Sequence, residues 1–167
     1  MITPEYVREM AAYNAWQNDS LYRAADALSD ADRQQDRGAF FGSIQATLAH
    51  VLWGDTIWMS RFDNWQPPEA SLEAARGQGV EWATLKRERA EADRRISAWA
   101  RRVGAADLDG ELSWFSVALG RELTRPRALL VMQLFNHQTH HRGQVHAMLT
   151  AAGAQPDDTD LPFRPGL

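Results

Sequence analysis

Residues 136–146 read Asn136-His137-Gln138-Thr139-His140-His141-Arg142-Gly143-Gln144-Val145-His146, and this run holds four of the five histidines of the chain. Apolar residues precede and follow the run, so we expect it to lie in a helix that is buried on several sides. A helix turns about 100° per residue, which places His137 and His141 one above the other on one face. Two imidazoles at this spacing can bind one transition-metal ion.

A third histidine ligand is available far upstream, because His50 lies in another strongly apolar helical pattern. A buried imidazole needs a partner for its ring nitrogens, either a backbone carbonyl or a metal ion. Together with His137 and His141, His50 makes a candidate set of three metal ligands. His140 could replace one of the pair, whereas His146 points to the opposite side of the helix. Ordinary hydrogen-bonded histidines are the alternative interpretation.

Other residues near these histidines are candidates for supporting roles. Gln144 lies within about 20° of His137 on the helical wheel, so it could orient a ligand or a bound water. A glutamine that simply faces solvent is the alternative. Trp53 lies one turn beyond His50 and could wall a pocket, although a core tryptophan is the simpler interpretation. With His140, these two residues form the predicted surroundings of the site, and no catalytic residue is assigned.

Three neutral nitrogen ligands suit several divalent ions, with zinc and nickel preferred over iron and cobalt. Structural zinc sites usually have four protein ligands, often cysteines, and this chain has no cysteine. We therefore expect one divalent ion per chain, with a coordination position open to water or substrate. The sequence contains no Glu-x-x-His or His-Glu-x-x-His pair, no Gly-x-Ser-x-Gly segment and no glycine-rich phosphate loop.

The remaining sequence predicts three more long helices, which makes the fold an all-α four-helix bundle with a crossover connection. The expected helices run from Thr3-Pro4-Glu5 to about residue 28, from Gly42-Ser43 to Asp63-Asn64, from Val80 to Gly104, and from Arg125-Pro126 to about Leu149. Hydroxyl caps, a first-turn proline and terminal glycines support these limits. We expect residues 1–167 to form a single domain.

The connections differ in character. Residues 29–38 are polar, and residues 64–79 form a long loop with one short turn around residues 71–76. Two short extended runs between Leu112 and Thr124 flank a glycine turn, which indicates a small hairpin before the last helix. The tail from residue 154 to the end has three prolines and is expected to lie along the surface.

Charge and hydropathy exclude several classes of partner. The formal net charge is −4, which gives no general attraction to nucleic acid. The segment Lys86-Arg87-Glu88-Arg89 is interrupted by an acid, so we interpret it as a solvated helix face. No run approaches the roughly 18 to 20 apolar residues of a membrane span, and no signal peptide pattern opens the chain. We expect a cytoplasmic protein that binds neither nucleic acid nor membrane.

Three motifs resemble the DinB/YfiT-like family. They are Tyr13-Asn14-Ala15-Trp16-Gln17-Asn18, Leu48-Ala49-His50-Val51-Leu52 and the run from Asn136 to Gln144. The resemblance spans nearly the whole chain, and the last motif is the most specific. It implies a four-helix bundle of up-down-down-up topology, frequently dimeric, with a divalent metal held by three histidines. The ligands of the family correspond here to His50, His137 and His141.

The resemblance also implies a range of activities. Some relatives resemble thiol-dependent transferases or isomerases that use low-molecular-weight thiols such as bacillithiol or mycothiol, and others are described as metal-dependent hydrolases. We expect a metal-dependent enzyme of the thiol S-transferase type, which joins a low-molecular-weight thiol to an electrophile. A metal-dependent hydrolase and a non-catalytic, stress-related metal- or ligand-binding protein are the alternatives. The expected partners are a small-molecule substrate and a second copy of the chain.

Overall fold

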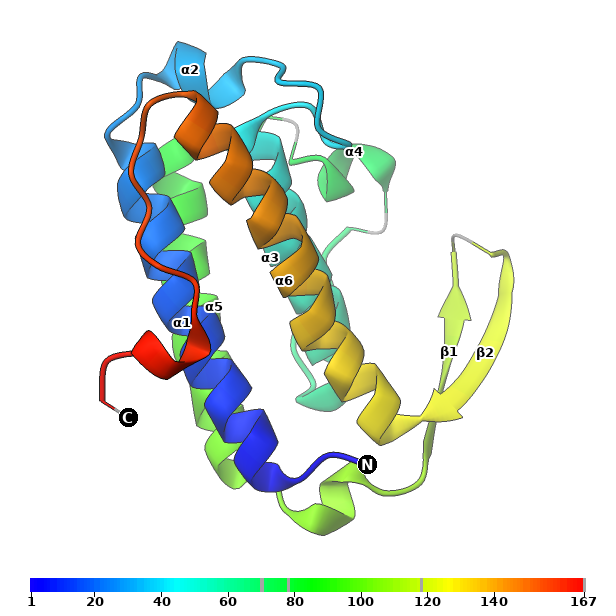
Figure 1. Cartoon of the computed structure of the whole chain (residues 1–167). Coiled ribbons are helices and arrows are strands. Elements are labelled where there is room, and N and C mark those ends of the chain that lie inside the picture. Colours follow the sequence, from blue (N-terminus) through cyan, green and yellow to red (C-terminus); the bar gives the residue numbers. More distant parts are fainter. Residues whose placement is uncertain (70, 78, 118, 167) are drawn as a thin grey trace.

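Four long helices form the body of this computed structural model, which describes residues 1–69, 71–77, 79–117 and 119–166. They are α1 (Pro4–Asp26), α3 (Ile44–Phe62), α5 (Trp82–Arg102) and α6 (Arg127–Ala151). In Figure 1, α1 and α6 ascend, whereas α3 and α5 descend. α1 packs against α5 and α6, and α3 packs against the same two helices. The link between α3 and α5 therefore crosses the length of the bundle.

Two of the long helices, α1 and α3, start at a predicted side-chain cap, and the other two do not. Thr3 accepts a hydrogen bond from the backbone N–H of Tyr6, and Ser43 accepts one from that of Ala46. α6 has no such side-chain cap. Its first residue, Arg127, instead donates its backbone N–H to the carbonyl of Gly110, at 3.0 Å. The start of α6 thus depends on the segment that precedes it.

That segment is the predicted hairpin, formed by β1 (Glu111–Ser116) and β2 (Arg121–Pro126) in antiparallel register. It projects from the bundle beside the first turns of α6 (Figure 1). Arg125 and Pro126 are paired with Leu112 and Glu111. Because these two residues belong to the strand, α6 begins at Arg127 rather than at the predicted Arg125-Pro126.

Four short elements complete the chain. They are α2 (Asp30–Gln34), α4 (Leu72–Ala75) and the 3₁₀ turns Ala105–Leu108 and Leu161–Phe163. α4 lies within the short turn predicted at residues 71–76. The helix α2 falls in a segment predicted to be a connection. Its start is nevertheless capped, because Ser29 accepts a hydrogen bond from the backbone N–H of Asp32.

All four long helices contribute to one apolar core. Its largest fully buried side chains include Leu21, Ile44, Leu48, Met59, Leu85, Leu134, Phe135 and Leu149. Burying a side chain of this size stabilises the fold by about 1.5–3 kcal/mol. No helix in the described part of the chain is long and apolar enough to span a membrane.

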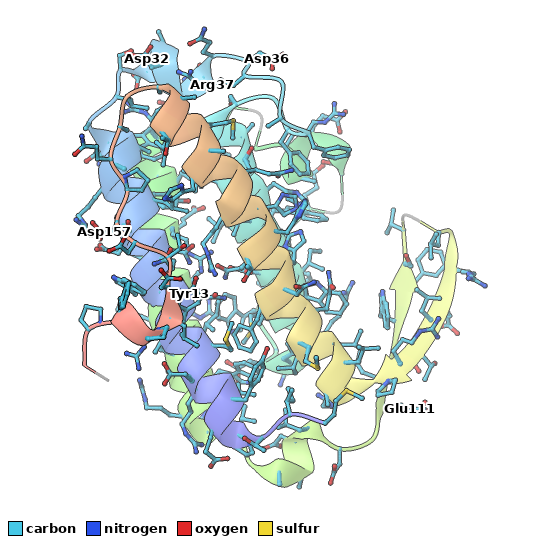
Figure 2. All side chains as sticks on the ribbon, viewed as in Figure 1. Tyr13, Asp32, Asp36, Arg37, Glu111 and Asp157 are labelled. Carbon is cyan, nitrogen blue, oxygen red and sulfur yellow. The ribbon has the colours of Figure 1, made fainter. Side chains whose placement is uncertain are left out.

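The C-terminal tail lies beside α1, as Figure 1 shows. The Tyr13 hydroxyl donates to the carbonyl of Thr159 at 2.7 Å, and the Gln17 amide donates to that of Asp158 at 2.9 Å. Figure 2 shows Tyr13 on the side of α1 that the tail covers. The predicted surface course of the tail is confirmed, and polar contacts to α1 hold it there.

Candidate metal centre

Three histidines from two neighbouring helices bring their ring nitrogens together. His50 lies on α3, and His137 and His141 lie one turn apart on α6. The Nε2 atoms of His50 and His137 are 3.0 Å apart, and one ring nitrogen from each of the three lies within 4.8 Å of the others. Antiparallel packing of α3 against α6 thus closes a sequence separation of 87 residues.

Hydrogen bonds on the outer side fix two of the rings. Nδ1 of His50 lies 3.0 Å from the carbonyl oxygen of Ala75 in α4. A carbonyl only accepts, so this Nδ1 carries the proton and Nε2 keeps a free lone pair. Nδ1 of His141 lies 2.8 Å from Oε1 of Gln144, and the same reasoning frees its Nε2. Both rings are therefore held as metal ligands usually are.

Burial keeps the three imidazoles neutral. It lowers the pKa of His50 to about 4, although the bond to Ala75 opposes the shift. Burial, together with the neighbouring imidazoles, lowers the pKa of His137 to about 3. Burial also lowers the pKa of His141. Neutral imidazoles offer lone pairs at physiological pH, which is the form that binds a metal ion.

His137 is pressed against α3 at a glycine. A Cβ atom on Gly54 would lie 2.7 Å from Cε1 of His137 and 3.2 Å from its Nδ1. Any side chain at position 54 would therefore push the ring away from His50. Nδ1 of His137 is buried and has no hydrogen-bond partner among the described residues. Burying an imidazole nitrogen without a hydrogen bond costs desolvation free energy, which packing alone does not offset.

The donor set fits a divalent transition-metal ion. Two nitrogens that are each about 2.0–2.1 Å from one zinc ion lie roughly 3.0–3.4 Å apart at ordinary bond angles. The 3.0 Å between the Nε2 atoms of His50 and His137 is the lower limit of that range. A cation between the rings would also accept the lone pairs of three neutral ring nitrogens, which otherwise face one another.

Aromatic side chains form the surroundings of His50. The ring of Phe41 stacks on that of His50, with 3.8 Å between centroids and an angle of 22°. The ring of Trp53 is nearly parallel to it as well, with centroids 5.9 Å apart, and its indole N–H donates to the carbonyl of Glu69. Trp53 thus lies beside His50. Phe41 was missed because it falls in a connection, although two successive phenylalanines in a polar segment are a usable signal.

The two remaining histidines do not join the cluster. His140 is exposed, and its ring centroid lies 4.8 Å from that of His141. His146 lines a different cavity, together with Tyr13 and Gln17 on α1. Gln144 contacts His141 rather than His137, its nearest neighbour on the helical wheel.

Comparison with known proteins agrees with this geometry. A sequence model of the DinB family matches residues 1–166. The chain belongs to the DinB family. Neither the curated proteins nor the solved structures give a match. For this DinB protein, family membership and the three-histidine cluster are both compatible with metal binding.

A buried polar network lies behind the metal centre of this DinB protein, and sequence reasoning missed it. Oδ2 of Asp55 accepts hydrogen bonds from Arg89 and from Gln138, both at 2.6 Å. Arg89 also donates to Asp93. The network draws on all four long helices, through Asn14, Asn18, Asp55, Arg89, Asp93, Gln138 and Arg142.

The network corrects one prediction. Arg89 was assigned to a solvated helix face but is only 2% exposed. It is buried because the carboxylates of Asp55 and Asp93 neutralise it inside the bundle. Asp55 follows Gly54 and Gln138 follows His137, so the network joins α3 and α6 beside the metal centre. One signal was available in the sequence. On α1 and α3, polar residues of the network stand one helical turn from apolar residues, which indicates that these polar residues are buried.

Proposed function

We propose that His50, His137 and His141 hold one divalent transition-metal ion and that the protein is a thiol S-transferase. One observation carries the proposal: three neutral imidazoles converge, and no other histidine or carboxylate of the described residues joins them. Sites with three protein ligands leave a coordination position free, whereas structural zinc sites usually have four. Zinc and nickel fit the nitrogen donors best. We also propose that the four long helices follow the up-down-down-up topology.

Residues of the chain orient the histidine rings and exclude water from them. When bound, the ion would lower the pKa of a thiol that reaches it and hold the sulfur in place. Ala75 and Gln144 fix the rings of His50 and His141, and Phe41 and Trp53 shield His50 from water. In the transfer a carbon–sulfur bond forms while the bond from that carbon to its leaving group breaks. The leaving group departs with the electron pair, and the thiol proton passes to solvent.

The test uses protein purified without an affinity tag. Elemental analysis should find about one divalent ion per chain, and this protein should accelerate the reaction of a small thiol with 1-chloro-2,4-dinitrobenzene. His137→Ala should lose both the ion and the acceleration. His146→Ala is the matched control, because it removes a histidine from the same helix but outside the cluster. Equal rates for wild type and His137→Ala would end the proposal.

A non-catalytic role is the second candidate, because the three histidines come from α3 and α6 and an ion would tie these helices together. In that case chelation lowers the melting temperature strongly, but no thiol binds. A metal-dependent hydrolase would use the same open position for water. Ester hydrolysis by the metal-loaded protein, without thiol transfer, would favour that reaction.

We further propose a cytoplasmic homodimer that acts on a small molecule and binds neither nucleic acid nor membrane. The family resemblance supports the dimer, and exposed apolar residues of the hairpin region, Phe115, Val117 and Leu119, supply surface for one. Light scattering during gel filtration should give twice the mass of the chain. A monomer at micromolar concentration would contradict this part of the proposal.

A further inference from the structure

Arg61, in the last turn of α3, is a partly buried cation with no anionic partner among the residues that the structure describes. Its guanidinium carbon lies 4.6 Å from the ring centroid of Trp58 and 5.6 Å from that of Trp114 on β1. No ion pair or hydrogen bond joins it to any other residue in the described parts of the chain. Burial lowers its pKa, and no neighbouring acid acts against that shift. By contrast, the buried Arg33 and Arg89 are each paired with a carboxylate.

Arg61 shares one face of α3 with the metal centre. The eleven steps from His50 to Arg61 correspond to about 20° of rotation and to about 16.5 Å along the helix axis. Side chains on a helix lean toward its N-terminus, and the contact of Arg61 with Trp58 has this direction. The guanidinium therefore reaches back toward His50.

A continuous strip of partly exposed side chains joins the two positions. We call it the α3 strip, and it consists of His50, Trp53, Ile57, Trp58 and Arg61. The opposite face of the helix is buried and includes Leu52, Asp55 and Met59. The α3 strip has a metal-binding end, an apolar middle and a cationic end. This order of chemistry defines the ligand that would fit along it.

We infer that Arg61, flanked by Trp58 and Trp114, binds the carboxylate of an elongated small-molecule substrate whose other end reaches the three histidines. The inference rests on the proposed function for the thiol end and adds the substrate class. A guanidinium can bind a carboxylate through two parallel hydrogen bonds. The indole rings reduce the access of water to this pair, which strengthens it. The apolar middle of the substrate packs on Trp53 and Ile57.

The test compares two thiols that differ only at the far end. These are 8-mercaptooctanoate and 8-mercaptooctan-1-ol, titrated into cobalt-loaded full-length protein. The sulfur-to-cobalt absorption band reports binding of the thiol end, and the dissociation constants report the far end. We expect wild type to bind the acid about tenfold more tightly than the alcohol. Arg61→Met should remove the preference, and Arg61→Lys should keep part of it.

Arg95→Met is the matched control. Arg95 also packs on an indole, with its guanidinium carbon 3.7 Å from the ring centroid of Trp65, but it lies on α5. Its replacement removes the same charge and the same kind of contact, and the acid preference should persist. Loss of the preference in Arg95→Met would mean that net charge alone attracts the acid, which would overturn the inference.

The outcomes separate the inference from the proposed function. If wild type binds acid and alcohol equally, or if Arg61→Met keeps the preference, Arg61 only clamps the hairpin and the inference is wrong. If neither thiol gives the absorption band, the proposed function fails. Octanoate then tests the carboxylate site alone in the metal-free protein. It should shift the NMR signals of the Arg61 side chain and the Trp114 indole, and octan-1-ol should not. Equal shifts, or none, would overturn the inference.

Discussion

Gly54 of α3 and His137 of α6 are in contact so close that a Cβ atom on the glycine would lie 2.7 Å from the imidazole ring. Position 54 lies one turn beyond His50 on the same helix. The absence of a side chain there lets α6 bring His137 within 3.0 Å of His50. The spacing of two proposed metal ligands thus depends on a residue that binds nothing itself.

Gly54→Ala should therefore weaken metal binding by about tenfold or more, because His137 must move away from His50. The alanine also favours helix formation by about 0.5–1 kcal/mol, so affinity is the cleaner measurement. Gly143→Ala is the control, because a Cβ there meets no atom within 4 Å. It should leave the affinity unchanged and raise the melting temperature. A competition titration with a chelator decides, and equal affinities for the two variants would contradict this account.

Asp55→Ala should destabilise the protein by about 3–5 kcal/mol, because it removes a fully buried partner of the Arg89 cation. Gln138 loses its acceptor in the same step. Asp19→Ala removes the exposed ion pair with Arg23 and should cost less than about 1 kcal/mol. Urea unfolding of the metal-free protein measures both. Similar small losses for the two variants would show that the buried network contributes little.

The long helices and the histidine cluster could be predicted because both follow from helical periodicity. The spacing of His137 and His141 sets their common face, and the apolar surroundings of His50 indicate an inward position. Caps at Thr3 and Ser43 mark two helix starts to within a residue or two. These signals are local, and each can be read without knowing which helices are neighbours.

The rest depends on contacts between distant residues. Arg89 is buried because of Asp55, which is 34 residues away, and a basic helical segment alone gives no sign of this partner. The role of Gly54 likewise appears only when α6 is placed against α3. Phe41 reaches His50 from a connection whose course no periodicity describes. The partner of a buried polar group and the distance between two packed helices both depend on the assembled bundle. The sequence therefore signals them only weakly.

Acid should destabilise the metal-free protein through its histidines. The pKa of His50 is lowered to about 4 and that of His137 to about 3, against about 6.5 in the unfolded chain. Between the folded and unfolded pKa values, the unfolded state therefore binds more protons than the folded state. The contribution of the two histidines to stability falls as the pH drops from about 6.5 toward 3–4. NMR titration should show midpoints for both rings well below 6.5. Midpoints near 6.5 would contradict the burial argument.

Unfolding experiments can separate this effect from that of Asp55. Burial raises the pKa of Asp55 to about 6, so its contribution is present at low pH and is lost as the pH rises through that value. The two contributions thus have opposite signs. His137→Asn should show a smaller loss of stability than wild type between pH 6.5 and pH 4. An identical pH dependence in both proteins would exclude His137 as its source.

Gln144→Ala should weaken metal binding by about 10- to 100-fold without unfolding the protein. Oε1 of Gln144 lies 2.8 Å from Nδ1 of His141 and accepts its hydrogen bond, which keeps the ring proton on Nδ1. Without it the ring can rotate or place the proton on Nε2, which removes the lone pair from the centre. Gln144 is only partly buried, so the melting temperature of the metal-free protein should change little. Gln144→Glu keeps an acceptor at this position and should bind the ion at least as tightly as wild type, because a carboxylate raises the basicity of the ring. If Gln144→Ala retains the wild-type affinity, His141 is oriented by the packing of α6 alone.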